Sequence, residues 1–461
     1  MPINDILVIF MFLTFIGLLF TGFPIGFILA GVAVIFTGIG YFSDLYLDTM
    51  TGLDFNLLGM IVNRVFKLMS NWVLVAIPMF VFMGLMLDKS AVAENMMRSM
   101  QDLFGKVRGG LAVTVAVIGI VLAASTGIIG ASVVLLGILS LPAMLKQGYD
   151  KSLALGTVAA SGTLGILIPP SIMLVIMADQ LNLAVGDLFM GAVFPGLILG
   201  CLYIAYLLIV GLVKPNAAPL SESRQDLSWR VLLNVAKDVL PPAFLILIVL
   251  GSIFGGITTP TEASGMGAVG AILLAIYNKK LTWQVMKEVA VDTYKTCGYI
   301  FGILIGAQAF ALVLRMLGGD EFIESSLTGL PFGPYGVLCV ILLVVFLLGF
   351  FLDWIEICLI MLPLLAPVVS NIGLDINGYG IVERPELVWF TVLVAVTLQT
   401  SFLTPPVGFA IFYIQGVAPP EVELIDIYKG VLPFVILQVI GLLAVLIWPQ
   451  LVTWLPAVAY G

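Results

Sequence analysis

The chain has 461 residues, of which 61% are hydrophobic and only 10% are charged, and its formal net charge is −8. Soluble domains usually need about a quarter of their residues charged, so this composition excludes an ordinary soluble fold. Apolar runs long enough to cross a bilayer core of about 30 Å recur along the sequence, as at 239–254, 335–352 and 430–448. The sequence therefore predicts an all-α polytopic membrane protein.

The chain has no histidine and four cysteines. The lack of histidine excludes metal–histidine sites, Ser-His-Asp or Cys-His catalysis and histidine proton relays. All four cysteines lie in apolar runs without CxxC spacing, which favours buried apolar side chains over disulfides or a metal site. HExxH and GxSxG motifs are also absent from the sequence. We therefore do not expect an enzyme.

The apolar runs form two matching series on either side of a polar segment, 214–238, which we predict to be a cytoplasmic linker. The first repeat, 1–213, is expected to contain scaffold spans within 5–88, a hairpin over 110–145, a broken helix over 152–178 and a span over 187–213. The second repeat, 239–461, is expected to contain scaffold spans within 239–315, a hairpin over 335–372, a broken helix over 388–416 and a span over 430–452. Pro169-Pro170 and Pro405-Pro406 occupy equivalent places in the two series. This agreement in order and spacing indicates an internal duplication.

The positions of the basic residues give a topology. If both hairpins are re-entrant and the N-terminus lies outside, fifteen of the 19 Lys and Arg residues fall in cytoplasmic segments. Only Arg64, Lys67, Arg315 and Arg384 fall outside, which is the positive-inside bias of membrane proteins. The same arrangement makes the two halves antiparallel. It predicts an inverted repeat, which is common in transporters, with both termini outside.

Four interruptions of the apolar runs are the candidate functional centres, because a helix break at membrane depth must be buried in protein or line a watery cavity. They lie at 124–132, 161–171, 349–356 and 399–408. Prolines cannot donate hydrogen bonds, so the two proline pairs should leave carbonyls about four residues earlier without helical donors. These carbonyls belong to Gly165, Ile166, Ser401 and Phe402.

Free carbonyls beside hydroxyl groups form a cage of hard oxygens suited to Na⁺. Pairing each hairpin tip with the Pro-Pro break of its own half predicts two symmetric cation sites with the solute between them. The alternative is that the proline and glycine kinks only shape the packing of the helices.

Polar side chains at these breaks are candidates for contact with the solute. Asp353 and Glu356 are the only acids deep in an apolar run, and a carboxylate inside a membrane is costly and usually functional. Alternatively, one of them caps a hairpin tip, or both lie near the membrane surface. The candidate solute contacts are Ser125, Ser132, Thr163, Asp353, Gln399 and Thr400.

At these residues the sequence resembles the large membrane subunit of tripartite ATP-independent periplasmic (TRAP) transporters over essentially its full length. The resemblance rests on Gly162-Thr163-Leu164-Gly165-Ile166-Leu167-Ile168-Pro169-Pro170-Ser171 and on Leu403-Thr404-Pro405-Pro406-Val407-Gly408, with support from 127–137 and 349–353. It implies an elevator mechanism in the bacterial inner membrane, in which a transport domain slides against a scaffold. It also implies coupling to two or more Na⁺ ions. The implied partners are a separate small four-helix membrane (Q) subunit and a periplasmic substrate-binding (P) protein that delivers an organic acid.

Carried over by position, the resemblance also implies the sodium ligands. One site would use Thr126, Ile129, Gly165, Ile168 and Pro169, and the other would use Gly349, Ser401, Thr404 and Val407. The chain departs from the commoner family pattern at the first hairpin tip, where consecutive serines are replaced by Thr126-Gly127-Ile128-Ile129-Gly130. A stand-alone organic anion symporter and a passive channel remain alternative functions, and an intramembrane enzyme is a more remote one.

Overall fold

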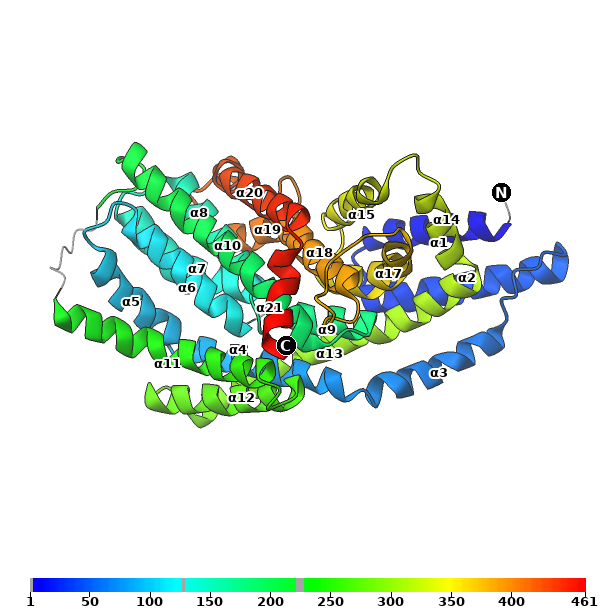
Figure 1. Ribbon diagram of the computed structural model, residues 1–461, viewed down its shortest axis with the longest axis horizontal. Coiled ribbons are helices and arrows are strands. Elements are labelled where there is room, and N and C mark those ends of the chain that lie inside the picture. The colour runs from blue at the N-terminus through cyan, green and yellow to red at the C-terminus, as the bar shows by residue number, and fades with distance from the viewer. Residues whose placement is uncertain (1–2, 127–128, 221–227) are drawn as a thin grey trace. The chain divides into compact units, whose positions relative to one another are not determined.

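The computed structural model describes residues 3–126, 129–220 and 228–461, and of residues 123–126 it describes only the backbone (Figure 1). These residues form helices and their connections, without any β-strand in the described ranges. Nine of the described helices are long and apolar enough to cross a membrane. The predicted all-α membrane fold is thus confirmed.

The chain divides into two compact units, and each is described by itself. Unit 1 comprises Met1–Trp72 and Lys295–Asp375. Its helices are α1 (Ile3–Leu19), α2 (Ile25–Tyr46), α3 (Phe55–Met69), the larger part of α13 (Trp283–Met316), α14 (Gly319–Thr328), α15 (Pro334–Leu348), α16 (Trp354–Glu356), the π-helical turn η3 (Ile357–Met361) and α17 (Leu362–Asn371). Helices α2 and α13 cross closely, because a Cβ atom on Gly26 would lie 2.9 Å from the carbonyl oxygen of Gly302. Glycine at such a crossing allows the two backbones to approach each other.

Unit 2 comprises Val73–Tyr294 and Ile376–Gly461. Its helices are most of the 3₁₀ turn η1 (Trp72–Val75), α4 (Ala76–Lys89), α5 (Val92–Phe104), α6 (Gly110–Thr126), α7 (Ile129–Lys146), α8 (Lys151–Thr163), the 3₁₀ turn η2 (Leu164–Ile166), α9 (Ile172–Leu181), α10 (Val185–Val213), α11 (Trp229–Phe254), α12 (Pro260–Tyr277), the first turns of α13, α18 (Pro385–Leu403), α19 (Phe409–Val417), α20 (Leu424–Ile447) and α21 (Gln450–Tyr460). Side chains begin several of them. Asp150 accepts a hydrogen bond from the Leu153 amide at 3.0 Å at the start of α8, and Thr259 and Glu262 form a capping box on α12.

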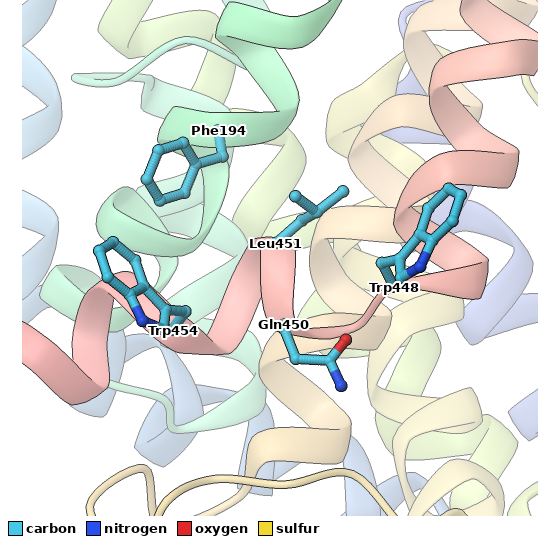
Figure 2. Close-up of a pocket in the computed structure, with 5 residues that line it drawn as sticks. All are labelled: Phe194, Trp448, Gln450, Leu451 and Trp454. Carbon is cyan, nitrogen blue, oxygen red and sulfur yellow. The ribbon is translucent and has the colours of Figure 1, made fainter.

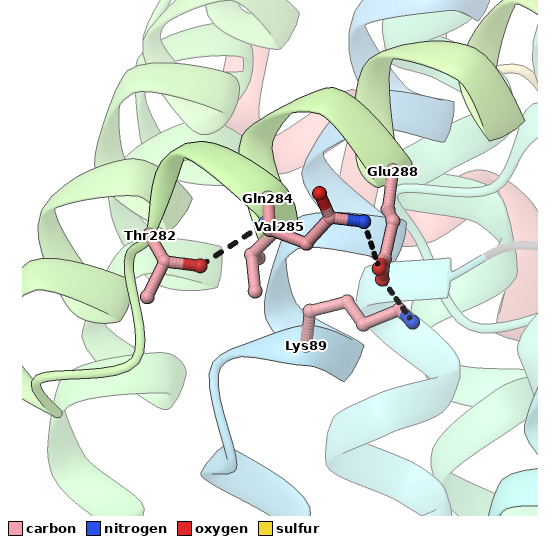
Figure 3. Close-up of polar contacts among 5 residues, drawn as sticks. All are labelled: Lys89, Thr282, Gln284, Val285 and Glu288. Carbon is pink, nitrogen blue, oxygen red and sulfur yellow. Dashed lines mark hydrogen bonds and ion pairs between the residues drawn. The ribbon is translucent and has the colours of Figure 1, made fainter.

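Figure 3 shows the polar contact at the end of α4. Lys89 Nζ lies 3.0 Å from Glu288 Oε2 on the first turns of α13, and Gln284 Nε2 donates to the other oxygen of Glu288 at 2.9 Å. The hydroxyl of Thr282 accepts from the amide of Val285 at 3.2 Å and caps the start of α13. Because Lys89 and Glu288 are both exposed, solvent screens this ion pair and it contributes little to stability.

The structure differs from the sequence-based expectation in two ways. Helix α11 begins at Trp229, inside the segment 214–238 that was predicted to be a linker, because the hydroxyl of Ser228 accepts from the Val231 amide at 3.4 Å and caps the helix. The compact units also draw on both predicted repeats. Unit 2 contains the first hairpin and both Pro-Pro segments, whereas the second hairpin belongs to unit 1. The inverted repeat, and the grouping of both hairpins in one transport domain, stay predictions.

Candidate functional site

The first Pro-Pro segment breaks its helix inside unit 2. Helix α8 ends at Thr163, η2 adds one 3₁₀ turn, and α9 begins only at Ile172. The Pro169–Pro170 peptide bond is cis. The hydroxyl of Ser171 donates to the carbonyl of Ile166 at 2.7 Å. Every residue from 161 to 178 is buried, so the break is enclosed by protein.

The second Pro-Pro segment also breaks its helix. Helix α18 ends at Leu403, α19 begins at Phe409, and the Pro405–Pro406 bond is cis. The backbone amide of Thr404 donates to the carbonyl of Ser401 at 3.1 Å, and its hydroxyl donates to the carbonyl of Thr400 at 2.6 Å. This segment is buried up to Leu403 and becomes accessible beyond it.

Two of the carbonyls that were expected to lose their donors have found others. The prolines do remove the helical donors four residues on, but the expectation that the carbonyls are left free is wrong: Ile166 accepts from the hydroxyl of Ser171, and Ser401 accepts from the amide of Thr404. Each replacement donor belongs to a residue directly next to the proline pair: Ser171 follows the first pair, and Thr404 precedes the second. A carbonyl oxygen has two lone pairs, so both groups keep the capacity for a further partner.

The first hairpin consists of α6 and α7, which lie side by side in Figure 1 and pack against α8. Small residues allow this close approach. A Cβ atom on Gly119 of α6 would lie 2.6 Å from the Cβ of Ser161, and one on Gly162 of α8 would lie 2.5 Å from Val133 Cγ2 on α7. Both arms of the hairpin also contact η2. The start of α7 therefore lies beside the first Pro-Pro break.

The first predicted sodium site falls on elements that pack together in unit 2. Ile129 begins α7, while Gly165, Ile168 and Pro169 belong to the enclosed break. The side chains of Thr126 and of the candidate solute contact Ser125 lie outside the described residues. Their roles stay predictions.

The second predicted sodium site has its residues in both units. Ser401, Thr404 and Val407 lie together at the end of α18 in unit 2, whereas Gly349 ends α15 in unit 1. Its predicted ligands are divided between the two units, so this site also stays a prediction.

Asp353 and Glu356, in unit 1, have different environments. Asp353 caps α16, since its Oδ1 accepts from the Trp354 amide at 2.8 Å. This is the capping role that the sequence left open as an alternative. Glu356 is fully buried, and neither of its carboxylate oxygens has a hydrogen-bond partner among the described residues. Of the two acids, Asp353 is thus the one whose carboxylate caps a helix.

The remaining candidate solute contacts lie in unit 2 and are all buried. The hydroxyl of Thr163 donates to the carbonyl of Ala160 and that of Thr400 to the carbonyl of Val396, both at 2.8 Å, so both hydroxyls bond within their own helices. Ser132 lies on α7 near the hairpin tip. Gln399 differs, because neither atom of its amide forms a hydrogen bond within the described ranges.

Sequence reasoning missed a link between the two broken helices. The Arg384 guanidinium, just before α18, donates to the carbonyl of Leu181 at 2.9 Å and to that of Asn182, at the C-terminus of α9. A cation at this end of a helix satisfies its last carbonyls and complements its dipole. The sequence offered only a lone basic residue outside the cytoplasmic segments.

An open pocket of about 330 Å³ lies at the junction of α20 and α21 (Figure 2). Its lining residues are Phe194, Trp448, Gln450, Leu451 and Trp454. Trp448 and Trp454 are 56% and 45% exposed, as is usual for tryptophans at a membrane interface. The pocket contains none of the predicted site residues that the structure describes, so we do not assign the solute to it.

Comparison with known proteins gives the same assignment as the motifs. Residues 12–451 match the model of the family described as "Tripartite ATP-independent periplasmic transporter, DctM component". The chain is 30% identical to the C4-dicarboxylate TRAP transporter large permease protein DctM of Vibrio cholerae, over 98% of both chains. It is 27% identical to the isethionate TRAP transporter permease protein DctMQ of Oleidesulfovibrio alaskensis, over 85% of this chain and 58% of that one.

A solved structure supports the fold. The YdaH transporter of Alcanivorax borkumensis superposes with a TM-score of 0.60 at 13% identity, covering 86% of this chain and 89% of that one. The relatives are named as transporter permeases and not as enzymes. The chain belongs to the family of DctM components, the large membrane subunits of tripartite ATP-independent periplasmic transporters.

Proposed function

We propose that this chain is the membrane subunit that imports a small organic acid at the expense of a sodium gradient. The observation that carries the proposal is the burial of both Pro-Pro breaks up to their prolines, with hydroxyl and carbonyl oxygens around them. Neutral hard oxygens at membrane depth suit a desolvated monovalent cation. The C4-dicarboxylate and isethionate named for two relatives suggest the class of solute.

Two or more sodium ions would bind at the breaks. The first site would use Thr126, Ile129, Gly165, Ile168 and Pro169, and the close packing of α6 and α7 on α8 supports it. The second would use Gly349, Ser401, Thr404 and Val407. Bound sodium would close the hairpin tips around the solute before the transport domain slides as an elevator. The inverted repeat and the re-entrant hairpins are part of this proposal.

The proposal includes two partners. The isethionate relative is named DctMQ, and this chain covers only 58% of its length. This supports a small Q component as the partner of the part that this chain matches. A periplasmic binding protein would deliver the acid to the outer face of the bacterial inner membrane, where both termini would lie.

Uptake into liposomes tests the proposal. The chain is reconstituted with its small subunit, and uptake of labelled succinate is measured with and without the binding protein and an inward sodium gradient. We expect uptake only when all components and the gradient are present. If uptake were equally fast with choline in place of Na⁺ at fixed pH, sodium coupling would be wrong. Uptake by this chain alone would instead support a stand-alone symporter.

A further inference from the structure

Unit 2 contains a buried polar cluster that joins one residue from each Pro-Pro break, Thr163 and Gln399, to Tyr203 and Gln438 outside the breaks. The hydroxyl of Tyr203 on α10 faces Gln438 on α20, Gln399 on α18 and Thr163 on α8. All four side chains are 0% exposed. Within the part of the chain that the structure describes, neither the hydroxyl nor either amide completes a hydrogen bond, whereas Thr163 bonds to Ala160.

Such a cluster is costly unless its polar atoms find partners. A buried polar group without a partner costs about 1–3 kcal/mol, and this cluster holds a phenol and two amides. The phenol and the two amides supply one O–H and four N–H donors together with oxygen acceptors. A cation binds to oxygen atoms and is repelled by the O–H and N–H donors of the cluster. A water molecule can donate to the oxygens and also accept from these donors. Polar groups that face one another without direct hydrogen bonds are the usual surroundings of a bridging water.

The cluster lies beside both broken helices. Gln399 comes two residues before Ser401, and Thr163 comes two residues before Gly165. Tyr203 and Gln438 belong to α10 and α20, which pack against α18 and continue past the breaks. A bonded network here would hold the last turns of α8 and α18 in a fixed relation to each other and to the two continuous helices.

We propose that Tyr203, Gln399 and Gln438 bind water and form a polar joint that couples the two broken helices. Tyr203 and Gln438 are positioning residues: they act on the breaks through Gln399 and Thr163. The transport part of this inference rests on the proposed function, while the binding of water does not. Binding of sodium at one break would then favour the ordered form of the other through the joint.

The chain offers a matched control for Tyr203. Tyr206 lies one turn further along α10, and both rings meet Phe434 edge-on, with centroid distances of 5.2 Å for Tyr203 and 5.1 Å for Tyr206. Tyr206 is only partly buried, and its charged neighbour is Asp150. Tyr203→Phe and Tyr206→Phe therefore each remove one tyrosine hydroxyl from α10. The first hydroxyl belongs to the joint, and the second lies outside it.

The first experiment measures sodium-driven uptake by the complete transporter. We expect Tyr203→Phe and Gln438→Leu to raise the sodium concentration for half-maximal uptake about fivefold and to lower the Hill coefficient for sodium. The double variant should change little beyond either single one, and Tyr206→Phe should behave as the unmodified protein. If both tyrosine variants behave alike, the joint does not couple the breaks. If the unmodified protein shows no sodium dependence, the proposed function fails instead.

The second experiment does not depend on transport or on a variant that folds. A density map of the unmodified complex at about 2 Å should show a peak within about 3.2 Å of Tyr203 Oη and of at least one amide. The atoms around this peak should include a hydrogen-bond donor, as they do around a bound water molecule. A cluster closed by direct hydrogen bonds, or a peak coordinated by oxygens only at the shorter distances of a cation, would overturn the proposal.

Discussion

The two Pro-Pro breaks share a motif but not an environment. In the first, burial continues without interruption from 161 to 178, across the prolines and into α9. In the second, burial is complete only up to Leu403. Pro406 is exposed, and α19 buries only Ala410, Ile411 and Ile414. The same local chemistry is therefore enclosed in one half of the sequence and open on one side in the other.

Glycine contacts explain part of this difference. On the first broken helix, a Cβ atom on Gly156 would overlap the carbonyl oxygen of Gly430 on α20, so two backbones touch there. On the second, no described atom outside the local backbone of α19 lies within 4 Å of the place where a Cβ on Gly416 would be. Backbones in contact cannot yield as a flexible side chain can. At Gly156 the first broken helix therefore has no space for an added atom, while at Gly416 the second half of the other broken helix has space.

Restoring helical donors to each break should have the largest effect. Replacing both prolines by alanine, at 169 and 170 or at 405 and 406, allows a continuous helix that occupies the carbonyls at the break. We expect sodium-driven uptake to fall to background in both variants. The enclosed first break has no space for the shift of α9 that a continuous helix requires, so only that variant should also melt at a lower temperature. Uptake at the unmodified rate by either variant would contradict the role of the breaks.

Adding one methyl group to each helix tests the enclosure directly. Gly156→Ala should destabilise the protein by about 3 kcal/mol, because the methyl group meets backbone atoms of Gly430. Gly416→Ala meets open space inside α19 and should stabilise it by up to ~1 kcal/mol, as alanine does in helices. Thermal melting in detergent, followed by tryptophan fluorescence, measures both. Equal melting temperatures for the two variants would remove the contrast between the breaks.

Each break also has one hydroxyl that satisfies a carbonyl, and the cost of removing it should follow burial. Ser171→Ala leaves the carbonyl of Ile166 without its donor in a fully buried place, which should cost about 1–3 kcal/mol. Thr404→Ala removes a similar bond to Thr400 at a half-buried place, where water can replace it, so the cost should be about 0.5 kcal/mol.

Melting temperatures of the Ser171 and Thr404 variants check this order. Thr404 is also a predicted sodium ligand, so its variant should mainly change the sodium concentration that uptake requires. A larger loss of stability for Thr404→Ala than for Ser171→Ala would reverse the comparison.

The positions of the breaks could be predicted from sequence because their cause is local. Two adjacent prolines remove donors, and small or hydroxylated residues around them permit the turn; at Gly408, a Cβ would lie 2.5 Å from the Phe402 carbonyl oxygen. Two prolines alone are not sufficient. Helix α11 continues through Pro241 and Pro242, which have no glycine or hydroxylated neighbours and follow Lys237-Asp238-Val239-Leu240.

What could not be predicted depends on which helices become neighbours. Tyr203 and Gln438 each lie in a long continuous apolar helix, where a single polar residue gives no pattern. They become a cluster only because α10, α18 and α20 pack together. The start of α11 at Trp229 was missed for a different reason: polar residues at Arg230, Asn234, Lys237 and Asp238 interrupt its first turns, which resemble a linker until the cap, Ser228, is recognised.

The smallest expected effect concerns the link between the broken helices. Arg384 joins the start of α18 to the end of α9 through two carbonyls, those of Leu181 and Asn182. Because its surroundings are partly exposed, Arg384→Ala should cost only about 1 kcal/mol, and Arg384→Lys should recover part of that since an ammonium still neutralises the helix end.

The Arg384 series has a matched control in Lys151→Ala. Lys151 makes one exposed bond, at 3.0 Å, to the carbonyl of Glu421, so its removal should change the melting temperature less than the loss of Arg384. If Arg384 ties the accessible break to the enclosed one, the stabilities of Gly156→Ala and Gly416→Ala should differ less when each is combined with Arg384→Ala. The reason is that α9 and α18 respond separately once Arg384 is removed. Strict additivity of these changes would mean that the two broken helices are joined only through their shared packing partners.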